Sequence, residues 1–122
     1  MSTENWQRIE GAIIAAIALI ISVMAGAGWS WWLWLVVLLL PDLSMAGYLA
    51  GPVRGAFVYN LFHLYASGLV LVLLGMLVGQ VDLITLGLLW LAHVGIDRAI
   101  GFGLKRPEGF SQTHLGQIDR RR

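Results

Sequence analysis

Four long apolar runs, separated by short breaks that contain polar residues or glycine, dominate the chain. They predict four helices, each with roughly the ~20 apolar residues that a bilayer core of about 30 Å requires, at about 9–28, 31–50, 54–79 and 83–103. A polar segment, 1–10, precedes the first run, and a polar tail, 104–122, follows the last. Because the breaks are short, consecutive helices run in opposite directions. The pattern predicts an all-α protein, an integral membrane four-helix antiparallel bundle.

The first two runs each need one further comment. Small residues at Ala25-Gly26-Ala27 follow the first apolar core, as they do at a signal-peptide cleavage site. Another apolar run has already begun by Trp29, however, which favours a membrane helix. In the second run, Pro41 removes a backbone donor and predicts a kink that frees a carbonyl in the turn before Asp42.

Composition agrees with a membrane protein. The chain is 58% hydrophobic and only 12% charged, whereas about a quarter of the residues in soluble domains are charged. Its formal net charge of +1 excludes the broad basic surface of a nucleic-acid-binding protein, so the expected partner is the lipid bilayer. The absence of cysteine excludes disulfides and thiolate chemistry.

The cations are distributed very unevenly. The two turns on one side of the predicted bundle contain no lysine or arginine, only Asp82. On the other side lie all eight cations: Arg8, Arg54, Arg98, Lys105, Arg106, Arg120, Arg121 and Arg122. Cytoplasmic loops carry the excess of such residues. We therefore expect a multi-pass protein with both termini in the cytoplasm.

Polar residues interrupt three of the apolar runs at similar depth. Asp42, His63 and His93 each lie nine or ten positions from the cytoplasmic end of their helix, or about 14 Å at 1.5 Å per residue. Asn60 and Asp97 lie one turn nearer the cytoplasm, on the faces that carry the two histidines. Charged groups at this depth cost about 3 kcal/mol each. We expect these five side chains to face one another between the helices.

Two imidazoles and two carboxylates form a normal ligand set for a divalent metal such as zinc. We predict His63, His93, Asp97 and Asp42 as the ligands. Water activated by the metal would hydrolyse a lipid amide or ester that arrives from the membrane, with Asp42 and Asp97 as the catalytic carboxylates. Further polar residues close to these positions are expected to support the site: Ser44, Tyr59, Asn60 and Arg98.

The same cluster allows three other interpretations. It can be a packing element, in which the polar groups only hold the helices together. It can be a proton relay in a small proton-coupled transporter. His63 and His93 can also be the axial ligands of a bis-histidine haem, although the acidic neighbours disfavour this.

Outside the helices, His114 is the one histidine of the tail. Phe110 and Leu115 can fold this segment back as a cytoplasmic lid that includes His114; a solvated loop histidine is the alternative. Small-residue steps such as Gly47-x-x-x-Gly51 allow close helix approach, either within the bundle or in a homodimer.

The chain resembles a family of small bacterial integral membrane proteins, the domain of unknown function DUF4260. The motifs that carry the resemblance are Pro41-Asp42-Leu43-Ser44, Tyr59-Asn60-x-x-His63, Trp90-Leu91-Ala92-His93-Val94-Gly95-Ile96-Asp97-Arg98, Gly101-Phe102-Gly103-Leu104-Lys105 and Thr113-His114-Leu115-Gly116. It extends over about 8–116 and implies a four-helix protein of the bacterial inner membrane, with no established activity. A looser analogy is to membrane hydrolases of the alkaline ceramidase and adiponectin-receptor type, which build a zinc site on several helices.

Overall fold

A computed structural model describes residues 1–118. The predicted basic end of the tail, Arg120 to Arg122, lies outside the described residues. The described chain is mostly helical, with six helices, one of them a long 3₁₀ helix, followed by three short strands. In chain order these are α1 (Thr3–Ala25), α2 (Trp31–Leu39), η1 (Leu40–Ala50), α3 (Pro52–Phe62), α4 (Tyr65–Val78), α5 (Val81–Ile100), β1 (Lys105–Arg106), β2 (Gly109–Thr113) and β3 (Gly116–Gln117).

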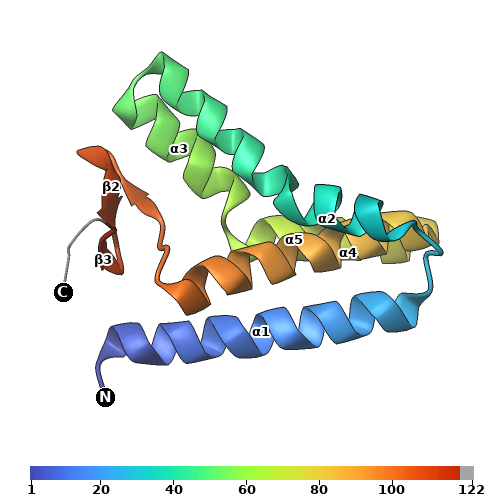
Figure 1. Ribbon diagram of the computed structural model, residues 1–122. Helices are drawn as coiled ribbons and strands as arrows, with labels where there is room; N and C mark the ends of the chain where they lie inside the picture. The colour runs from blue at the N-terminus through green and yellow to red at the C-terminus, as the bar shows by residue number, and fades with distance from the viewer. Residues whose placement is uncertain (119–122) are drawn as a thin grey trace.

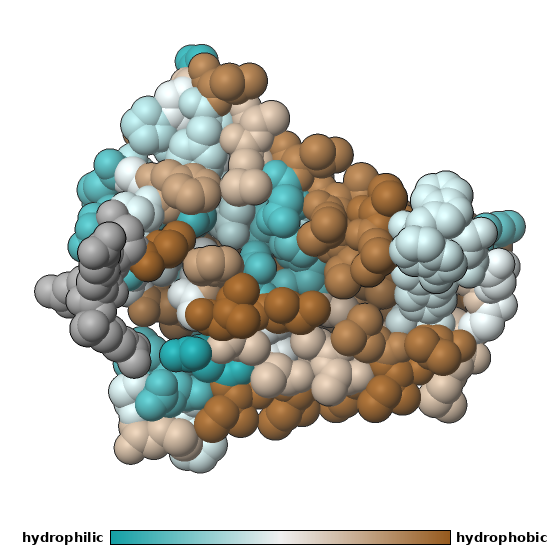
Figure 2. Space-filling model, viewed as in Figure 1, coloured by the Kyte–Doolittle hydropathy of each residue, from teal (hydrophilic) through white to brown (hydrophobic). Residues whose placement is uncertain are grey.

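Three helical stretches are long and apolar enough to cross a membrane: Thr3–Ala25, Trp31–Ala50 and Val81–Ile100. Helices α3 and α4 together make a fourth if the bent pair is counted as one span. Apolar residues cover the sides of these helices, whereas hydrophilic residues gather at the end where the termini lie and in a hollow between the helices (Figure 2). Such an apolar band with polar ends suits a membrane protein.

Helix α5 is the most buried element, and α1, α2 and α4 all pack against it. Helices η1 and α3 pack on each other and lead away from α1 and α5 at an angle (Figure 1). The small sheet contacts α3 and lies between this hairpin and the end of α5 (Figure 1). Both ends of the described chain lie at this same end of the molecule. That this end faces the cytoplasm remains a prediction from the distribution of cations.

Glycines allow the close packing around α5. A Cβ on Gly95 would lie 2.5 Å from the carbonyl oxygen of Gly11 in α1, and one on Gly87 would lie 2.7 Å from the carbonyl oxygen of Gly68 in α4. Only residues without a side chain allow backbones to approach so closely. These small residues therefore act inside the molecule, and the homodimer remains a prediction.

The second apolar run changes its helix type at Pro41, where the sequence predicts a kink. It is an α-helix up to Leu39 and a 3₁₀ helix from Leu40 to Ala50. The change begins where the N–H of Leu40 bonds to the carbonyl of Val37, three residues back. In this pattern the carbonyl of Leu38 would pair with the nitrogen of Pro41, which carries no hydrogen. Pro41 thus leaves the Leu38 carbonyl available to another donor.

The predicted continuous helix over 54–79 is broken. Helix α3 ends at Phe62, α4 begins at Tyr65, and their axes differ by 43°. A break inside a membrane is tolerated only where other groups bind the freed carbonyls. Here Arg98 donates to the carbonyl of His63 at 2.9 Å, and Trp90 donates to that of Phe62 at 2.7 Å. Both of these donors come from α5, and within 54–79 the hydroxyl of Ser67 donates to the carbonyl of Leu61.

The tail corrects the all-α prediction. Residues 105–117 form an antiparallel three-stranded sheet in the order β1-β2-β3. Lys105 pairs with Thr113, and Thr113 pairs with Gly116 across the second turn. Strands this short are not stable alone, so the sheet depends on its contacts with α3. The polar composition of 104–122 and its Pro107 predict only a loop.

Candidate metal centre

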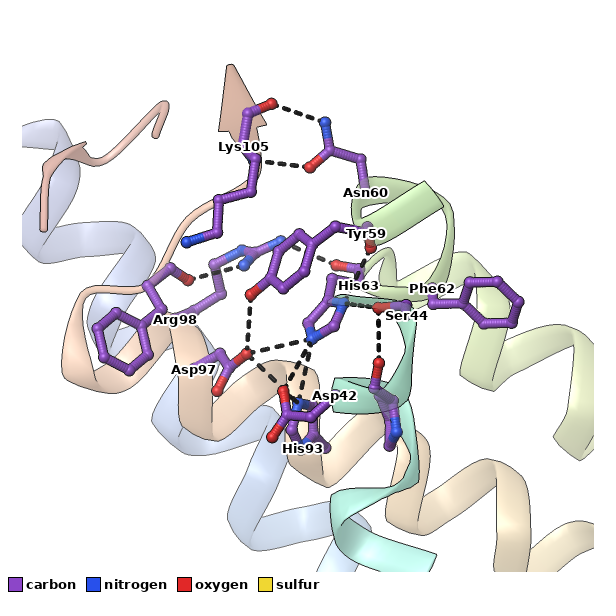
Figure 3. A network of polar contacts seen from close by, with 12 residues as sticks. Asp42, Ser44, Tyr59, Asn60, Phe62, His63, His93, Asp97, Arg98 and Lys105 are labelled. Atoms are coloured by element: carbon purple, nitrogen blue, oxygen red, sulfur yellow. Dashed lines mark hydrogen bonds and ion pairs between the residues drawn. The ribbon is translucent and has the colours of Figure 1, made fainter. Parts of the chain in front are cut away.

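Asp42, His63, His93 and Asp97 come together in one cluster (Figure 3). Asp42 lies in η1, His63 lies at the break between α3 and α4, and the i,i+4 pair of His93 and Asp97 lies on α5. Each residue offers one ligand atom, and all four atoms lie within 4.8 Å of one another. The predicted meeting of three segments far apart in sequence is therefore present.

Five of the six distances between these atoms are close to those between the ligands of a tetrahedral metal ion, and the sixth, between Asp42 and Asp97, is at most 4.8 Å. His93 Nε2 lies 3.2 Å from His63 Nε2, 3.2 Å from Asp42 Oδ1 and 3.4 Å from Asp97 Oδ2. His63 Nε2 lies 3.5 Å from each of the same two oxygens. Ligands about 2.0–2.2 Å from a tetrahedral zinc ion lie about 3.3–3.6 Å from one another. The cluster is thus close to the size that such an ion needs.

A backbone carbonyl orients the His63 imidazole. His63 Nδ1 lies 2.9 Å from the carbonyl oxygen of Tyr59. Since a carbonyl only accepts, Nδ1 carries the hydrogen and the lone pair of Nε2 points into the cluster, as in a metal-binding histidine with a backbone acceptor. The Nε2 of His93 lies 3.2 Å from that of His63, so both histidines present Nε2 to the cluster.

The four side chains differ in their access to the surface. The side chain of His63 is 0% exposed, that of His93 6% and that of Asp97 11%. That of Asp42 is 38% exposed. Asp42 is thus the most exposed member of the cluster.

Two of the predicted supporting residues touch the cluster. Tyr59 stacks on the His63 ring with centroids 3.7 Å apart, and its hydroxyl donates to Asp97 Oδ2 at 3.4 Å. Ser44 Oγ donates to the carbonyl of Pro41 at 2.7 Å and lies 3.4 Å from His63 Nδ1. They hold His63 and Asp97 in place.

Asn60 has a different role from the one expected, because it faces the tail and not the cluster. Its amide nitrogen donates to the carbonyl of Lys105 at 2.8 Å, and its amide oxygen accepts from the N–H of Lys105 at 2.6 Å. This pair of bonds imitates a strand partner and attaches β1 to α3.

Arg98 is neither at the surface nor paired with a carboxylate among residues 1–118. It is 5% exposed, and its guanidinium donates to the carbonyls of His63 and Phe102. Its role is to satisfy backbone groups where α3 breaks and α5 ends.

Sequence reasoning missed Lys105, which resembles any other cation of the polar tail. The residue is only 5% exposed. Its ammonium lies 3.8 Å from the centre of the Phe110 ring and 5.1 Å from that of Tyr59. Burial lowers the pKa of Lys105, and the negative charge of Asp97 partly opposes this. No pattern in the sequence indicates that β1 turns this side chain towards Tyr59 (Figure 3).

His114, the predicted lid residue, fixes the tail to the helices and does not touch the cluster. The N–H of Leu104 donates to its Nδ1 at 2.8 Å, so its Nε2 carries the hydrogen and donates to Gln7 at 3.0 Å. Partial burial of the ring, with the positive charges of Arg98 and Arg106, lowers the pKa of His114.

This contact predicts a pH-dependent attachment of the tail. A protonated ring cannot accept the N–H of Leu104. Because the pKa of His114 is lowered in the folded protein, the stabilisation is complete above its ordinary value of 6.5 and is lost as the pH falls through the lowered pKa. Hydrogen exchange should show a several-fold lower protection factor for the Leu104 amide at acidic pH. The control His114→Ala should abolish that pH dependence, and an unchanged dependence would contradict the assignment.

Comparison with known proteins identifies the family. The family described as domain of unknown function (DUF4260) matches residues 4–118, and the chain therefore belongs to it. No curated protein and no solved structure matches the chain.

Proposed function

We propose that this DUF4260 protein binds a divalent metal ion, zinc by its preference for nitrogen and oxygen ligands, within the membrane. The observation that carries the proposal is the set of five distances of 3.2–3.5 Å that join Nε2 of His63 and His93 to each other and to one oxygen each of Asp42 and Asp97. Atoms so arranged surround a single point, where a cation would contact all four.

A packing role alone explains this arrangement less well. Hydrogen bonds join atoms in pairs, and a carboxylate has two oxygens with which to satisfy separate partners. Here one oxygen of Asp42, Oδ1, and one of Asp97, Oδ2, each face both imidazoles. The two Nε2 atoms lie 3.2 Å apart, so a proton or a metal ion must lie between them, and only a metal ion would also contact both carboxylate oxygens.

Haem does not fit the cluster. The two axial histidines of a haem approach the iron from opposite faces of a flat ring. His63 and His93 have their Nε2 atoms 3.2 Å apart, and carboxylate oxygens lie within 3.5 Å of both. No plane between the imidazoles is left for a porphyrin.

Hydrolysis of a lipid ester or amide is the activity that this centre supports best. Four protein ligands make a closed site, whereas a catalytic site keeps one position for water. Asp42 can open that position, because it comes from the separate hairpin of η1 and α3 and its side chain is 38% exposed. The bound ion would acidify water there. Asp42 would then accept the proton, and His63, His93 and Asp97 would hold the ion.

Elemental analysis of the purified protein tests this proposal. We expect about one zinc ion per chain in the native protein and less than about a tenth of that in His63→Ala, because removal of a ligand from a four-ligand site lowers affinity steeply. The matched control is His114→Ala, which removes the one histidine outside the cluster and should keep its metal. The same samples are assayed for fatty-acid release from phospholipid micelles, expected only from metal-loaded protein.

Two results would contradict the proposal. Metal lost equally from His63→Ala and His114→Ala would indicate adventitious binding to histidines. A native protein without metal, even after incubation with zinc, would leave the cluster with a packing or proton-transfer role.

A further inference from the structure

The ammonium of Lys105 contacts no carboxylate in the described chain. The residue is 5% exposed. The rings of Phe110 and Tyr59 stabilise it through their faces, but they accept no strong hydrogen bond from its three N–H groups. A buried lysine of this kind normally has an anionic partner.

The position of Lys105 connects that charge to the metal centre. Phe110, the Lys105 ammonium, the Tyr59 ring and the His63 ring follow one another as a stack, with the ammonium 5.1 Å from the centre of Tyr59 and the two rings 3.7 Å apart. The Tyr59 hydroxyl extends from this stack to Asp97. A molecule that contacted both the ammonium and the cluster would therefore lie along Tyr59 (Figure 3).

The charges around the centre indicate an anionic ligand. Asp42 and Asp97 contribute two negative charges, Arg98 and Lys105 contribute two positive charges, and the sum is zero. A divalent ion would raise the sum to +2. In a medium of low dielectric constant, a net positive charge of this size costs free energy. An anionic group on the substrate would reduce that net charge.

An apolar pocket borders Phe62, the residue that precedes His63 in the chain. It has a volume of about 370 Å³ between η1, α3 and α5, and its walls include Leu40, Val58, Phe62 and Trp90. Ser44, which lies 3.4 Å from His63 Nδ1, also borders it. Such a space beside membrane-spanning helices suits a hydrocarbon chain.

We propose that Lys105 binds the phosphate of a glycerophospholipid whose ester group faces the metal centre and whose acyl chain enters the apolar pocket. The inference rests on the proposed function, because it names the substrate class of that site. Lys105 lies in the tail beyond α5, the last helix that is long and apolar enough to span a membrane, whereas the residues of the cluster lie within the candidate spans. A phosphate at the membrane surface and an acyl chain in the bilayer would follow the same order.

Native mass spectrometry in a neutral detergent tests the inference with three ligands: phosphatidylglycerol, diacylglycerol with the same chains, and inorganic phosphate. We expect Lys105→Met to weaken the binding of phosphatidylglycerol about tenfold, because it removes a charge-assisted contact. The matched control Arg106→Met removes the neighbouring, exposed charge and should bind like the native protein. Diacylglycerol should bind weakly and equally to all three proteins.

Three outcomes would overturn the inference: equal losses in Lys105→Met and Arg106→Met, diacylglycerol binding as tight as that of phosphatidylglycerol, or inorganic phosphate binding as tight as either lipid. The last would assign the subsite to free phosphate. If Lys105→Met does not fold, Lys105→Arg, which keeps the charge, should retain the binding of phosphatidylglycerol. The comparison of phosphatidylglycerol with diacylglycerol on the native protein then tests whether the phosphate contributes to binding.

Metal content, measured in the same samples, separates this inference from the proposed function. Lys105→Met should keep its metal, because Lys105 contacts none of the four ligands. A native protein without metal that still binds phosphatidylglycerol through Lys105 would refute the metal centre alone. If the native protein contains metal but Lys105→Met binds phosphatidylglycerol as tightly as the native protein does, the phosphate subsite alone is refuted.

Discussion

Removal of the metal by a chelator is expected to lower the Tm of the native protein by about 15 °C. The four ligands come from three separate segments, so the ion binds the folded chain and not the unfolded one. At a free concentration about 1,000 times its Kd, such a ligand stabilises a protein by about 4 kcal/mol, and each kcal/mol shifts the Tm of a chain of this size by about 4 °C. Thermal unfolding in detergent, with and without chelator, measures the shift.

The control for this experiment is His93→Ala, in which the site has lost a ligand. Its Tm should lie below that of the native protein and should not respond to chelator. Equal shifts in the native protein and in His93→Ala would show that the chelator acts elsewhere, and no shift in either would show that no metal stabilises the fold.

The substitution Gly11→Val is expected to destabilise the protein by about 3 kcal/mol. A Cβ at Gly11 would lie 2.6 Å from the Cβ of Arg98 and 2.7 Å from the carbonyl oxygen of Gly95. Neither atom is the flexible end of a side chain, so α1 must move away from α5, and overpacking of this kind costs about 1–3 kcal/mol or more. Denaturation in mixed micelles measures the loss.

Gly109→Ala is the matched control, because a Cβ at Gly109 would meet no atom within 4 Å. It should change the free energy of unfolding by less than about 0.5 kcal/mol. If Gly11→Val is as mild as Gly109→Ala, the close approach of α1 and α5 does not contribute to stability.

Much of the helical content could be predicted because apolar runs have a direct physical meaning. A run of about 20 apolar residues is stable in a bilayer only as a helix, and three such helices, with the bent pair α3 and α4, occupy the four predicted runs. The meeting of Asp42, His63 and His93 was also predictable, because charged groups deep in a bilayer must turn inward.

Features that depend on partners from other segments could not be predicted. The break at His63 exists because Arg98 and Trp90 bind the freed carbonyls, and the sheet exists because Asn60 supplies bonds to Lys105. The apolar pattern therefore predicts neither the break nor the strands, and it places Asn60 in the cluster, whereas Asn60 binds the tail. Lys105 carried no local signal at all.

The amino-acid sequence by itself determined which segments are apolar enough to be transferred from water and which polar residues lie within those segments. This is so because the free energy of transfer of each residue from water to an apolar environment depends mainly on its own side chain. Only the tertiary structure decided that two Nε2 atoms and two carboxylate oxygens surround one point, and that a lysine of the tail lies beside it. Those positions depend on the distances between segments. Backbone breaks and close contacts at glycines set these distances, and each such contact involves residues from two segments.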